Sequence, residues 1–406
     1  MYDVIVVGAR CAGSPTAMLL GRRGARVLLV DRATFPSDIM STHFIHNTGI
    51  ACLQRWGLLD SLAASNCPPI RQATLDVGPF ALTGSPLPAE GVADAYAPRR
   101  TVLDKLLVDA AAAAAGVEVR TGFVVTDLVW DGDRVTGIRG RDTAGATVTE
   151  TAQVVVGADG MHSFVARQVK ALTYHDQPPL TCGYYAYWSG VPCLGLEVYL
   201  RPQRNLLAFP TNDGLTCVIA IWPHAEFHQV RSDIEGNFLR ALDLAPNLAE
   251  RVRQGRREER YIGTAATPNF FRQPYGSGWA LVGDAGYHKD PVIGRGITDG
   301  FLDAERLAGA LTEGFSDRRS LIGSLEGYKE ERDIAALPLY RLTCDRARLA
   351  APTPQLVALA AALRGNPEQA ERFLSINSGV VTAAEFFAPD NIQRIMAGAS
   401  REISPA

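Results

Sequence analysis

Short apolar runs flank a helical pattern in the first thirty residues of the chain. Tyr2–Val7 and Arg26–Val30 are β-branched apolar runs, and Ala12–Arg23 between them repeats its apolar residues at helical spacing. Continuous apolar runs of this length are typical of strands that are buried on both faces. The pattern therefore predicts a βαβ unit that opens a parallel sheet.

Helical and strand patterns continue to alternate up to residue 156. The elements predicted in chain order are a helical segment over Thr42–Ala64, strands and loops over Ile70–Leu87, a helix over Arg100–Ala115 that ends at Gly116, a strand at Val117–Arg120, and an antiparallel meander from Gly122 to Val154. The meander then leads into an apolar run at Val154–Val156. We expect this run to return to the first sheet, so that the first lobe is built from separated stretches of chain.

The second half of the chain changes from a β-rich to a helical pattern. Thr181–Trp222 holds four short β-rich stretches separated by Pro192, Pro202 and the Asn212–Gly214 turn. This spacing predicts an antiparallel sheet in a second lobe. Trp279–Val282 predicts one more buried strand, and the residues from Gly296 to Ile395 are predominantly helical in pattern.

Composition restricts the classes of function. The 406 residues are 47% apolar and carry a formal net charge of −3, without a basic run that would indicate nucleic-acid binding. No stretch approaches the ~20 apolar residues of a membrane span. The first strand begins so close to Met1 that we expect no secretory signal and a cytoplasmic location. Seven scattered cysteines without a CxxC pair predict no disulfides. The close histidine pairs are His43 with His46 and His224 with His228, and no third ligand accompanies the second pair, so we expect no metal site.

The link between the first strand and the first helix carries the first chemical signal. Gly8 and Gly13 bound a tight turn where a pyrophosphate can approach the backbone and the helix N-terminus. Arg10 replaces the middle glycine of the usual pattern and adds positive charge there. Asp31 ends the second strand, where an acidic side chain accepts hydrogen bonds from the ribose of adenosine. These residues predict a Rossmann-type dinucleotide site.

Two later segments resemble a known family. Val155–Gly160, followed by Ser163, Val165 and Arg167, resembles the Asp-Gly motif of group A flavoprotein monooxygenases, the p-hydroxybenzoate hydroxylase-like class. The segment Gly283–Ala285, followed by Pro291, Gly294, Gly296, Gly300, Asp303 and Ala304, resembles the Gly-Asp motif of that family. The sequence departs from the family at Tyr287, where histidine is usual, at Thr298, where asparagine is frequent, and at Arg10.

The resemblance implies FAD as the cofactor and a set of residues that bind it. Asp284 would accept from a ribityl hydroxyl, and the helix that opens at Gly294 and Gly296 would face the flavin. Arg100 corresponds to the arginine near the phosphates, with Arg99 as the alternative, and His43 is the candidate catalytic group beside the flavin. The full cofactor-binding set is Gly8, Arg10, Cys11, Ala12, Gly13, Asp31, Arg32, Thr42, His43, Arg100, Val125, Asp159, Gly160, Gly283, Asp284, Pro291, Gly294, Gly296 and Ile297.

The expected fold is α/β, with a Rossmann-type FAD-binding domain interleaved with an antiparallel-sheet substrate lobe and a helical C-terminal region. We assign the FAD-binding domain to residues 1–70, 99–175 and 271–330, the substrate lobe to residues 71–98 and 176–270, and the helical region to residues 331–406. The substrate pocket is expected to use aromatic residues of the second lobe, namely Tyr185, Tyr187, Phe209 and Trp222.

By resemblance, the protein would use NAD(P)H and O2 to hydroxylate or epoxidise a small aromatic or polyketide-like molecule through a flavin C4a-hydroperoxide. A reductase of the geranylgeranyl type shares the same motifs and stays open as an alternative. A flavin-dependent halogenase fits less well, because such enzymes need a lysine between the first turn and the Arg100 helix, and no lysine precedes Lys105. A binding protein that had lost its cofactor residues would not keep Asp31 and Asp284.

Overall fold

A parallel sheet assembled from distant parts of the chain forms the centre of the first lobe. The computed structural model describes residues 1–316 and 320–402. The strand order of this sheet is β17 (Tyr275–Gly276), β18 (Trp279–Leu281), β8 (Thr147–Gly157), β1 (Tyr2–Val7), β2 (Val27–Asp31) and β5 (Val117–Thr121). From β18 to β5 all neighbours in this order run parallel, whereas β17 pairs antiparallel with β18. The expected βαβ opening and the return of the chain at Val154–Val156 are confirmed.

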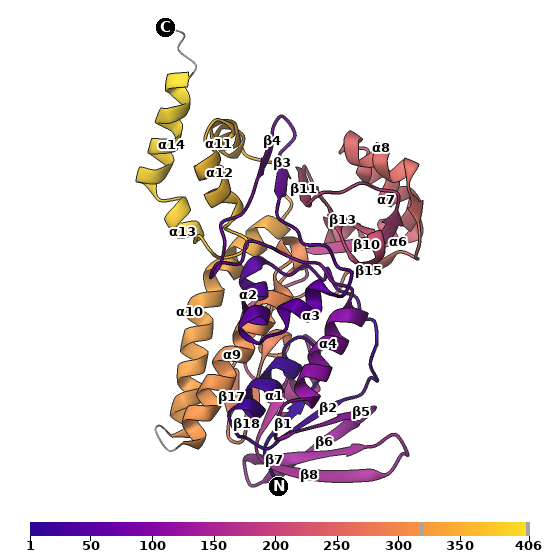
Figure 1. Cartoon of the computed structure of the whole chain (residues 1–406), viewed down its shortest axis with the longest axis vertical. Coiled ribbons are helices and arrows are strands. Elements are labelled where there is room, and N and C mark those ends of the chain that lie inside the picture. Colours follow the sequence, from indigo (N-terminus) through magenta and orange to yellow (C-terminus); the bar gives the residue numbers. More distant parts are fainter. Residues whose placement is uncertain (317–319, 403–406) are drawn as a thin grey trace.

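Strand alternation directs the two faces of this sheet to different layers. Val4 and Val6 face the helices α1 (Gly13–Arg22), α4 (Arg100–Ala112) and α9 (Gly296–Phe315). Ile5 and Val7 face the meander formed by β6 (Val124–Asp131), β7 (Arg134–Arg141) and the start of β8, with α5 (Phe164–Gln168) beside it. Figure 1 shows this meander at the foot of the molecule, below the helices. The expected meander is confirmed.

The continuous helix predicted over Thr42–Ala64 is wrong at its start and its centre. Residues 42–46 are irregular, α2 spans Asn47–Arg55, and α3 spans Leu59–Ala63. His43 has a positive φ of 38°, and Gly57, with φ of 74°, ends the first helix. Ile45 forms an isolated antiparallel bridge with Tyr96, which holds the segment before α2 in an extended path.

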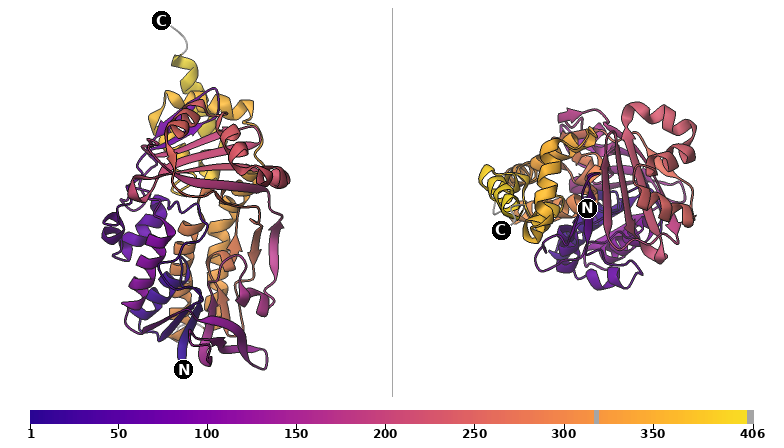
Figure 2. Two further views of the ribbon diagram at one scale, coloured as in Figure 1. Left: turned by 90° about the vertical axis from the view of Figure 1, so that its right-hand side faces the viewer. Right: turned by 90° about the horizontal axis from the view of Figure 1, so that it is seen from above.

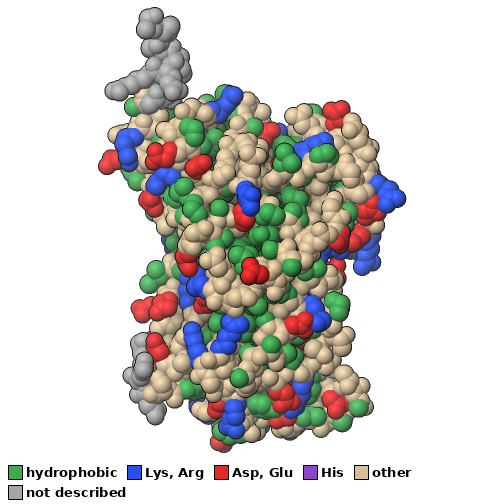
Figure 3. Space-filling model, in the orientation of Figure 1, with side chains coloured by type: hydrophobic (Ala, Val, Ile, Leu, Met, Phe, Trp, Pro, Cys, Tyr) green, Lys and Arg blue, Asp and Glu red, His purple; other side chains and the backbone are tan. Residues whose placement is uncertain are grey.

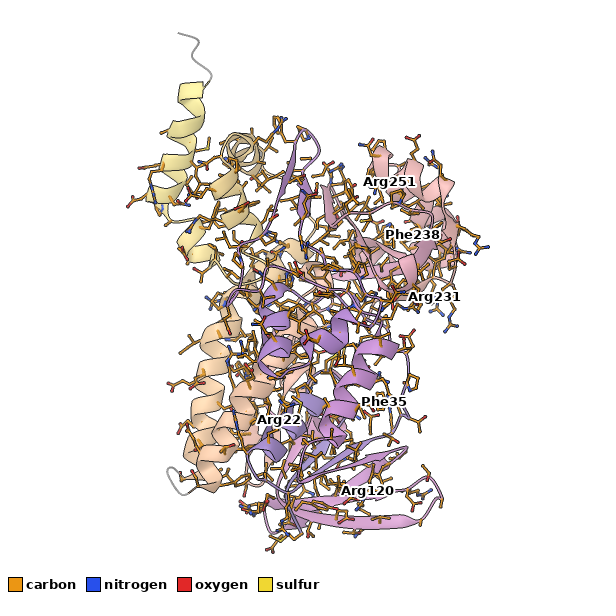
Figure 4. The ribbon with its side chains drawn as sticks, in the orientation of Figure 1. Arg22, Phe35, Arg120, Arg231, Phe238 and Arg251 are labelled. Carbon is orange, nitrogen blue, oxygen red and sulfur yellow. The ribbon has the colours of Figure 1, made fainter. Side chains whose placement is uncertain are left out.

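The second lobe is an eight-stranded mixed sheet covered by helices on one face. It contains β10 (Thr181–Ser189), β11 (Leu196–Arg201), β12 (Arg204–Pro210) and β13 (Thr216–Pro223), which confirms the four strands expected there. The remaining strands are β3 (Ala73–Asp76), β4 (Ala81–Gly84), β14 (Arg256–Arg257) and β15 (Ile262–Thr264). The covering helices are α6 (Phe227–Ser232), α7 (Ile234–Leu242) and α8 (Pro246–Gln254), and Figure 4 labels Phe238 of α7 among them. The opposite face of the sheet is turned toward the rest of the molecule (Figure 2).

A small sheet and the C-terminal helices complete the fold. The small sheet consists of β9 (Thr173–Gln177), β16 (Asn269–Arg272) and β19 (Tyr287–His288). The C-terminal helices are α10 (Leu321–Ala347), α11 (Pro354–Arg364), α12 (Pro367–Leu374), α13 (Ala383–Phe386) and α14 (Pro389–Glu402), which confirms the helical pattern after Gly296. Helix α10 packs on α9 and continues past residue 330 without a break. Helices α11 to α14 share a core cluster with Leu82 of β4, so they lie against the second lobe (Figure 1).

No helix in the described ranges is long and apolar enough to cross a membrane.

Candidate functional site

The first turn has the geometry of a phosphate-binding loop. Gly8 has a φ of 105°, and a Cβ added there would lie 2.5 Å from the carbonyl oxygen of Ala158. A Cβ on Gly13 would lie 1.7 Å from the carbonyl oxygen of Gly8. The turn therefore requires glycine at both positions. Helix α1 has no side-chain cap at its N-terminus, so its first N–H groups can face an anion.

Two arginines share one buried carboxylate beside this turn. Arg100 donates from Nε and Nη2 to Asp104 at 3.0 and 3.1 Å, and Arg10 donates to the same carboxylate. Two guanidinium charges against one carboxylate leave a net positive charge that suits a pyrophosphate. Arg99 points elsewhere, to Glu259 at 2.9 Å and over the ring of Tyr187 at 3.8 Å. Arg100 is therefore the arginine that the fold brings to the first turn.

Asp31 is positioned by the backbone at the other end of the same turn. Its two carboxylate oxygens accept from the N–H groups of Ala9 at 2.7 Å and Ala33 at 2.8 Å. Each oxygen keeps a second lone pair that can accept from a ribose hydroxyl. Phe123 donates its N–H to the carbonyl oxygen of Asp31, which places the start of β6, including Val125, near this corner. Arg32 is exposed next to it.

Asp284 has the free acceptor that a cofactor hydroxyl requires. It follows β18 in the turn Gly283–Ala285 and is half-buried. Among residues 1–316 and 320–402, none donates a hydrogen bond to its carboxylate, although the charge of Arg100 lies near enough to interact with it. An ionic acceptor in this position is costly to leave unpaired. This carboxylate therefore fits a bound group that carries hydroxyls.

Open space lies beside the backbone where α9 begins. Gly294 adopts a left-handed conformation with φ of 64°, after the turn Pro291–Ile293 that Asp290 caps by accepting from Val292 N–H at 3.0 Å. A Cβ added to Gly296 would meet nothing within 4 Å, so space lies alongside the start of α9, before Ile297. Together with the positive charge at the first turn and the free carboxylate of Asp284, this open start of a helix fits an extended FAD molecule.

The carboxylate of Asp159 accepts hydrogen bonds from residues that follow it closely in the sequence. Its carboxylate accepts from the Ser163 hydroxyl at 2.5 Å, from Phe164 N–H at 2.6 Å and from Val165 N–H at 3.1 Å. It therefore caps the short helix α5. Gly160 follows with φ of 78° and open space around its Cα. Binding of flavin or nicotinamide by these two residues stays a prediction.

His43 does not line the cavity described below, and its role as the catalytic group beside the flavin stays a prediction. Its Nδ1 lies 3.0 Å from the carbonyl oxygen of Ala97, and its Nε2 lies 3.0 Å from the Tyr187 hydroxyl. Burial lowers its pKa to about 3, so the imidazole is neutral. Both ring nitrogens are paired within the protein, and the side chain joins the two lobes.

His46 is a cavity residue that the sequence analysis did not assign. It lines the cavity with Thr42 and Phe44, and its Nε2 lies 3.0 Å from the carbonyl oxygen of Ile293. Burial is the main cause that lowers its pKa to about 4. Its spacing of three from His43 was visible in the sequence, but only the irregular backbone at residues 42–46 decides which of the two faces the cavity.

A cavity of about 360 Å³ lies where the two lobes and the C-terminal helices meet. Its first wall is the inner face of the second sheet, with Leu196, Val198, Leu207, Phe209, Ile219 and Ile221. Its second wall is the cofactor side, with Thr42, Phe44, His46 and Pro291–Gly294. Its third wall is C-terminal, with Leu342, Arg346, Phe373, Asn377 and Phe387. In Figure 3, hydrophobic side chains are concentrated in the middle and upper part of the face shown.

Strand alternation separates the four aromatic residues expected in the pocket. Phe209 lines the cavity. Tyr185 and Tyr187 lie in the same core cluster as Phe209, but they do not line the cavity. The prediction for Trp222 is wrong, because it points to the opposite face of β13 and packs in the cluster under α7 and α8. Residues 221 and 222 of one strand necessarily face opposite sides of the sheet.

Comparison with known proteins agrees with this geometry. Residues 1–182 match the family model described as "FAD binding domain". The kynurenine 3-monooxygenase of Salinispora arenicola is 28% identical over 337 residues, covering 76% of this chain and 72% of its own. The digeranylgeranylglycerophospholipid reductase of Methanocella arvoryzae is 27% identical over 314 residues, covering 76% of each chain. The structure of the myxobacterial chondrochloren halogenase CndH superposes with a TM-score of 0.79 at 22% identity, covering 100% of this chain and 98% of that one.

The fold, the dinucleotide turn and the matched domain define a flavoprotein with a Rossmann-type FAD-binding domain. The resemblance found in the sequence is thereby confirmed. Residues 1–182 form an FAD-binding domain, the chain is similar to group A flavoprotein monooxygenases, and it is an FAD-dependent oxidoreductase.

Proposed function

We propose that this protein is a monooxygenase that uses NAD(P)H and O2 to hydroxylate or epoxidise an aromatic or polyketide-like small molecule. The observation that carries the proposal is the cavity, which begins at the segments that fit the flavin and extends along the apolar face of the second sheet. When bound, FAD supplies the electron transfer and the oxygen chemistry. The protein orients the substrate beside the cofactor and excludes water from the site.

Different residues of the chain would bind the cofactor and line the cavity for the substrate. The first turn with Arg10 and Arg100 would hold the pyrophosphate, and Asp284 would accept from the ribityl chain. Phe209, Ile219 and Ile221 form an apolar wall that can hold a ring and exclude water. His46 on the cofactor side stays neutral at physiological pH and brings no charge that would attract water to that wall.

The lysines of the chain argue against halogenation, which needs an uncharged amine within reach of the substrate. The sequence contains four lysines, and none lines the cavity. Lys105 and Lys329 pair with Asp109 and Asp333. Lys289 is buried in an ion pair with Asp299. Lys170 lies exposed at the end of α5.

Isotope labelling distinguishes the three reactions represented among the similar proteins. Purified holoprotein is incubated with NADH or NADPH, labelled O2, bromide, and a panel of phenols, quinones, polyketide-like aromatics and prenyl lipids. The proposal expects a product that gains one labelled oxygen atom and no halogen, with faster NAD(P)H consumption when substrate is present. A product that gains two hydrogens identifies a reductase, and a brominated product identifies a halogenase; either result overturns the proposal.

A further inference from the structure

Arg346 differs from the other arginines that line the cavity. Arg71, Arg201 and Arg204 each form an ion pair with a carboxylate, at 2.8, 2.8 and 2.7 Å. Arg346 donates from Nη1 to Asn377 Oδ1 at 2.5 Å, and within the described parts of the chain no carboxylate lies within 4 Å of it. Burial lowers the pKa of its guanidinium to about 10, and no neighbouring acid offsets that effect.

The acid next to Arg346 in the sequence does not neutralise it. Asp345 also lines the cavity, but it is exposed and pairs with Arg348 at 3.0 Å. Arg346 lies one position further along α10, on another side of the helix. The cavity therefore contains one guanidinium whose charge is not compensated by the described protein.

Hydrogen-bond donors remain free at the same place. The Oδ1 of Asn377 accepts a hydrogen bond from Arg346. The Nδ2 of Asn377 donates to no described acceptor. The same holds for Nε and Nη2 of Arg346. Both side chains line the cavity. A partly buried cation without a counter-ion is costly, and a planar guanidinium with two free donors matches an oxyanion in a bidentate contact.

This donor pair is connected to the segment that fits the flavin. Arg295, between Gly294 and Gly296, donates to the carbonyl oxygens of Asn377, at 3.2 Å, and of Ser378. Helix α10 also contacts the turn Pro291–Ile293. An anion held by Arg346 and Asn377 therefore has a fixed position relative to the start of α9.

We propose that Arg346 and Asn377 form an anion-binding site that receives a carboxylate or phosphate of the substrate, while the apolar remainder of the molecule fills the cavity. The inference rests on the proposed function, because it takes this cavity as the substrate site. It adds the chemical class of the substrate, an apolar or aromatic anion, and the C-terminal residues that recognise it.

Binding of a matched pair of probes to the FAD-loaded protein tests the site. By calorimetry, 2-naphthoate should bind at least tenfold more tightly than the neutral 2-naphthamide. Arg346→Gln should weaken naphthoate binding at least tenfold and leave naphthamide binding unchanged. Arg71→Gln is the control, because it removes the same charge from the same cavity but from an arginine that is already paired. Geranyl phosphate, measured in parallel, shows whether a carboxylate or a phosphate is preferred.

A second variant keeps the test valid if Arg346→Gln fails to fold. Asn377→Asp is isosteric and places a carboxylate within hydrogen-bond distance of Arg346, so it should fold and abolish the preference for naphthoate. Naphthoate affinity that is unchanged in either folded variant, or wild-type protein that binds neither anion, overturns the proposal. Because the readout is binding, it does not depend on turnover: failure of the oxygen-labelling experiment would overturn the proposed reaction and leave the anion site to be judged by these affinities.

Discussion

At the scale of single residues, Asp284 and Asp303 show how two aspartates of one motif differ in environment. Asp284 is half-buried and receives no hydrogen bond from the described residues, whereas Asp303 is buried within α9 and pairs with Arg306 at 3.1 Å. We predict that Asp284→Ala weakens FAD binding by roughly 1 kcal/mol or more, about fivefold, because a hydrogen bond to a cofactor hydroxyl is lost. Fluorescence titration of the deflavinated protein with FAD measures this effect, and Asp303→Asn should bind FAD as the wild type does. Equal losses in the two variants would show that Asp284 does not contact the cofactor.

Asp303 should instead control how stability depends on pH. Burial raises its pKa from 3.8 to about 6, against the lowering effect of Arg306 and Arg332, and Asp299 adds to the rise. The native state thus binds this proton more tightly than the unfolded chain does. Protonated Asp303 therefore contributes to the free energy of unfolding. This contribution is fully present below pH 4 and is lost as the pH rises to 6, a change on the order of 3 kcal/mol.

We therefore predict that Asp303→Asn, which is neutral at every pH, gains stability relative to the wild type between pH 4 and pH 6, and that the gain stays constant above pH 6. Urea unfolding at intervals of half a pH unit measures the difference in the free energy of unfolding. The difference between the free energies of unfolding of the variant and the wild type does not contain the effect of His43 and His46. Because their pKa values are lowered in the native state, these histidines destabilise both proteins equally as the pH falls below 6.5. A difference that does not change with pH would show that Asp303 is ionised throughout.

At the scale of elements, the two faces of strand β13 contribute to different parts of the molecule, a core cluster and the cavity. Trp222 is 2% exposed and packs under the covering helices, whereas Ile219 on the other face lines the cavity. We predict that Trp222→Ala lowers the free energy of unfolding by about 3–5 kcal/mol through the loss of a large buried side chain. It should not change the affinity for cavity ligands.

Ile219→Trp should instead lower the affinity for cavity ligands, because the larger ring fills part of the cavity. Ligand affinity should fall at least tenfold while FAD is retained. Thermal unfolding and calorimetry with 2-naphthoate on both variants measure the two effects. If Trp222→Ala changed ligand affinity as strongly as Ile219→Trp does, the assignment of the two faces would be wrong.

At the scale of the whole molecule, Arg295 connects the cofactor side to the C-terminal helices. It pairs with Asp299 at 2.9 Å within α9 and reaches the carbonyl oxygens of Asn377 and Ser378, which follow α12. We predict that Arg295→Met loosens the C-terminal wall and admits water to the cavity. In a flavin monooxygenase, water in the site diverts reduced cofactor and oxygen to hydrogen peroxide.

The ratio of hydrogen peroxide formed to NAD(P)H consumed should therefore rise at least twofold in Arg295→Met when substrate is present. Arg55→Met is a suitable control, since Arg55 pairs with Glu305 of the same helix near the surface. An unchanged ratio in Arg295→Met would mean that the C-terminal wall is held by its apolar contacts alone.

The elements and motifs that depend on local pattern could be predicted from the amino-acid sequence. The βαβ opening, the meander, the four strands of the second lobe and the C-terminal helices follow from apolar periodicity and from turn residues, which act over a few positions. The dinucleotide turn and Asp284 were also visible, because a phosphate loop and a strand-end carboxylate each occupy adjacent residues. The family resemblance gave the cofactor for the same reason.

Which side chains share the cavity could not be predicted from the sequence, because it depends on contacts between distant segments. His43 and His46 are three residues apart in an irregular segment, and their orientations depend on the positive φ of His43 and on contacts with residues 97 and 293. Trp222 was misassigned because residue type does not reveal which face of a strand meets the core. Arg346 and Asn377 lie on different C-terminal elements, and their unpaired donors depend on which distant groups fail to reach them. Contacts between residues that are far apart in the sequence depend on how whole layers of the structure pack, and a local sequence pattern does not predict that packing.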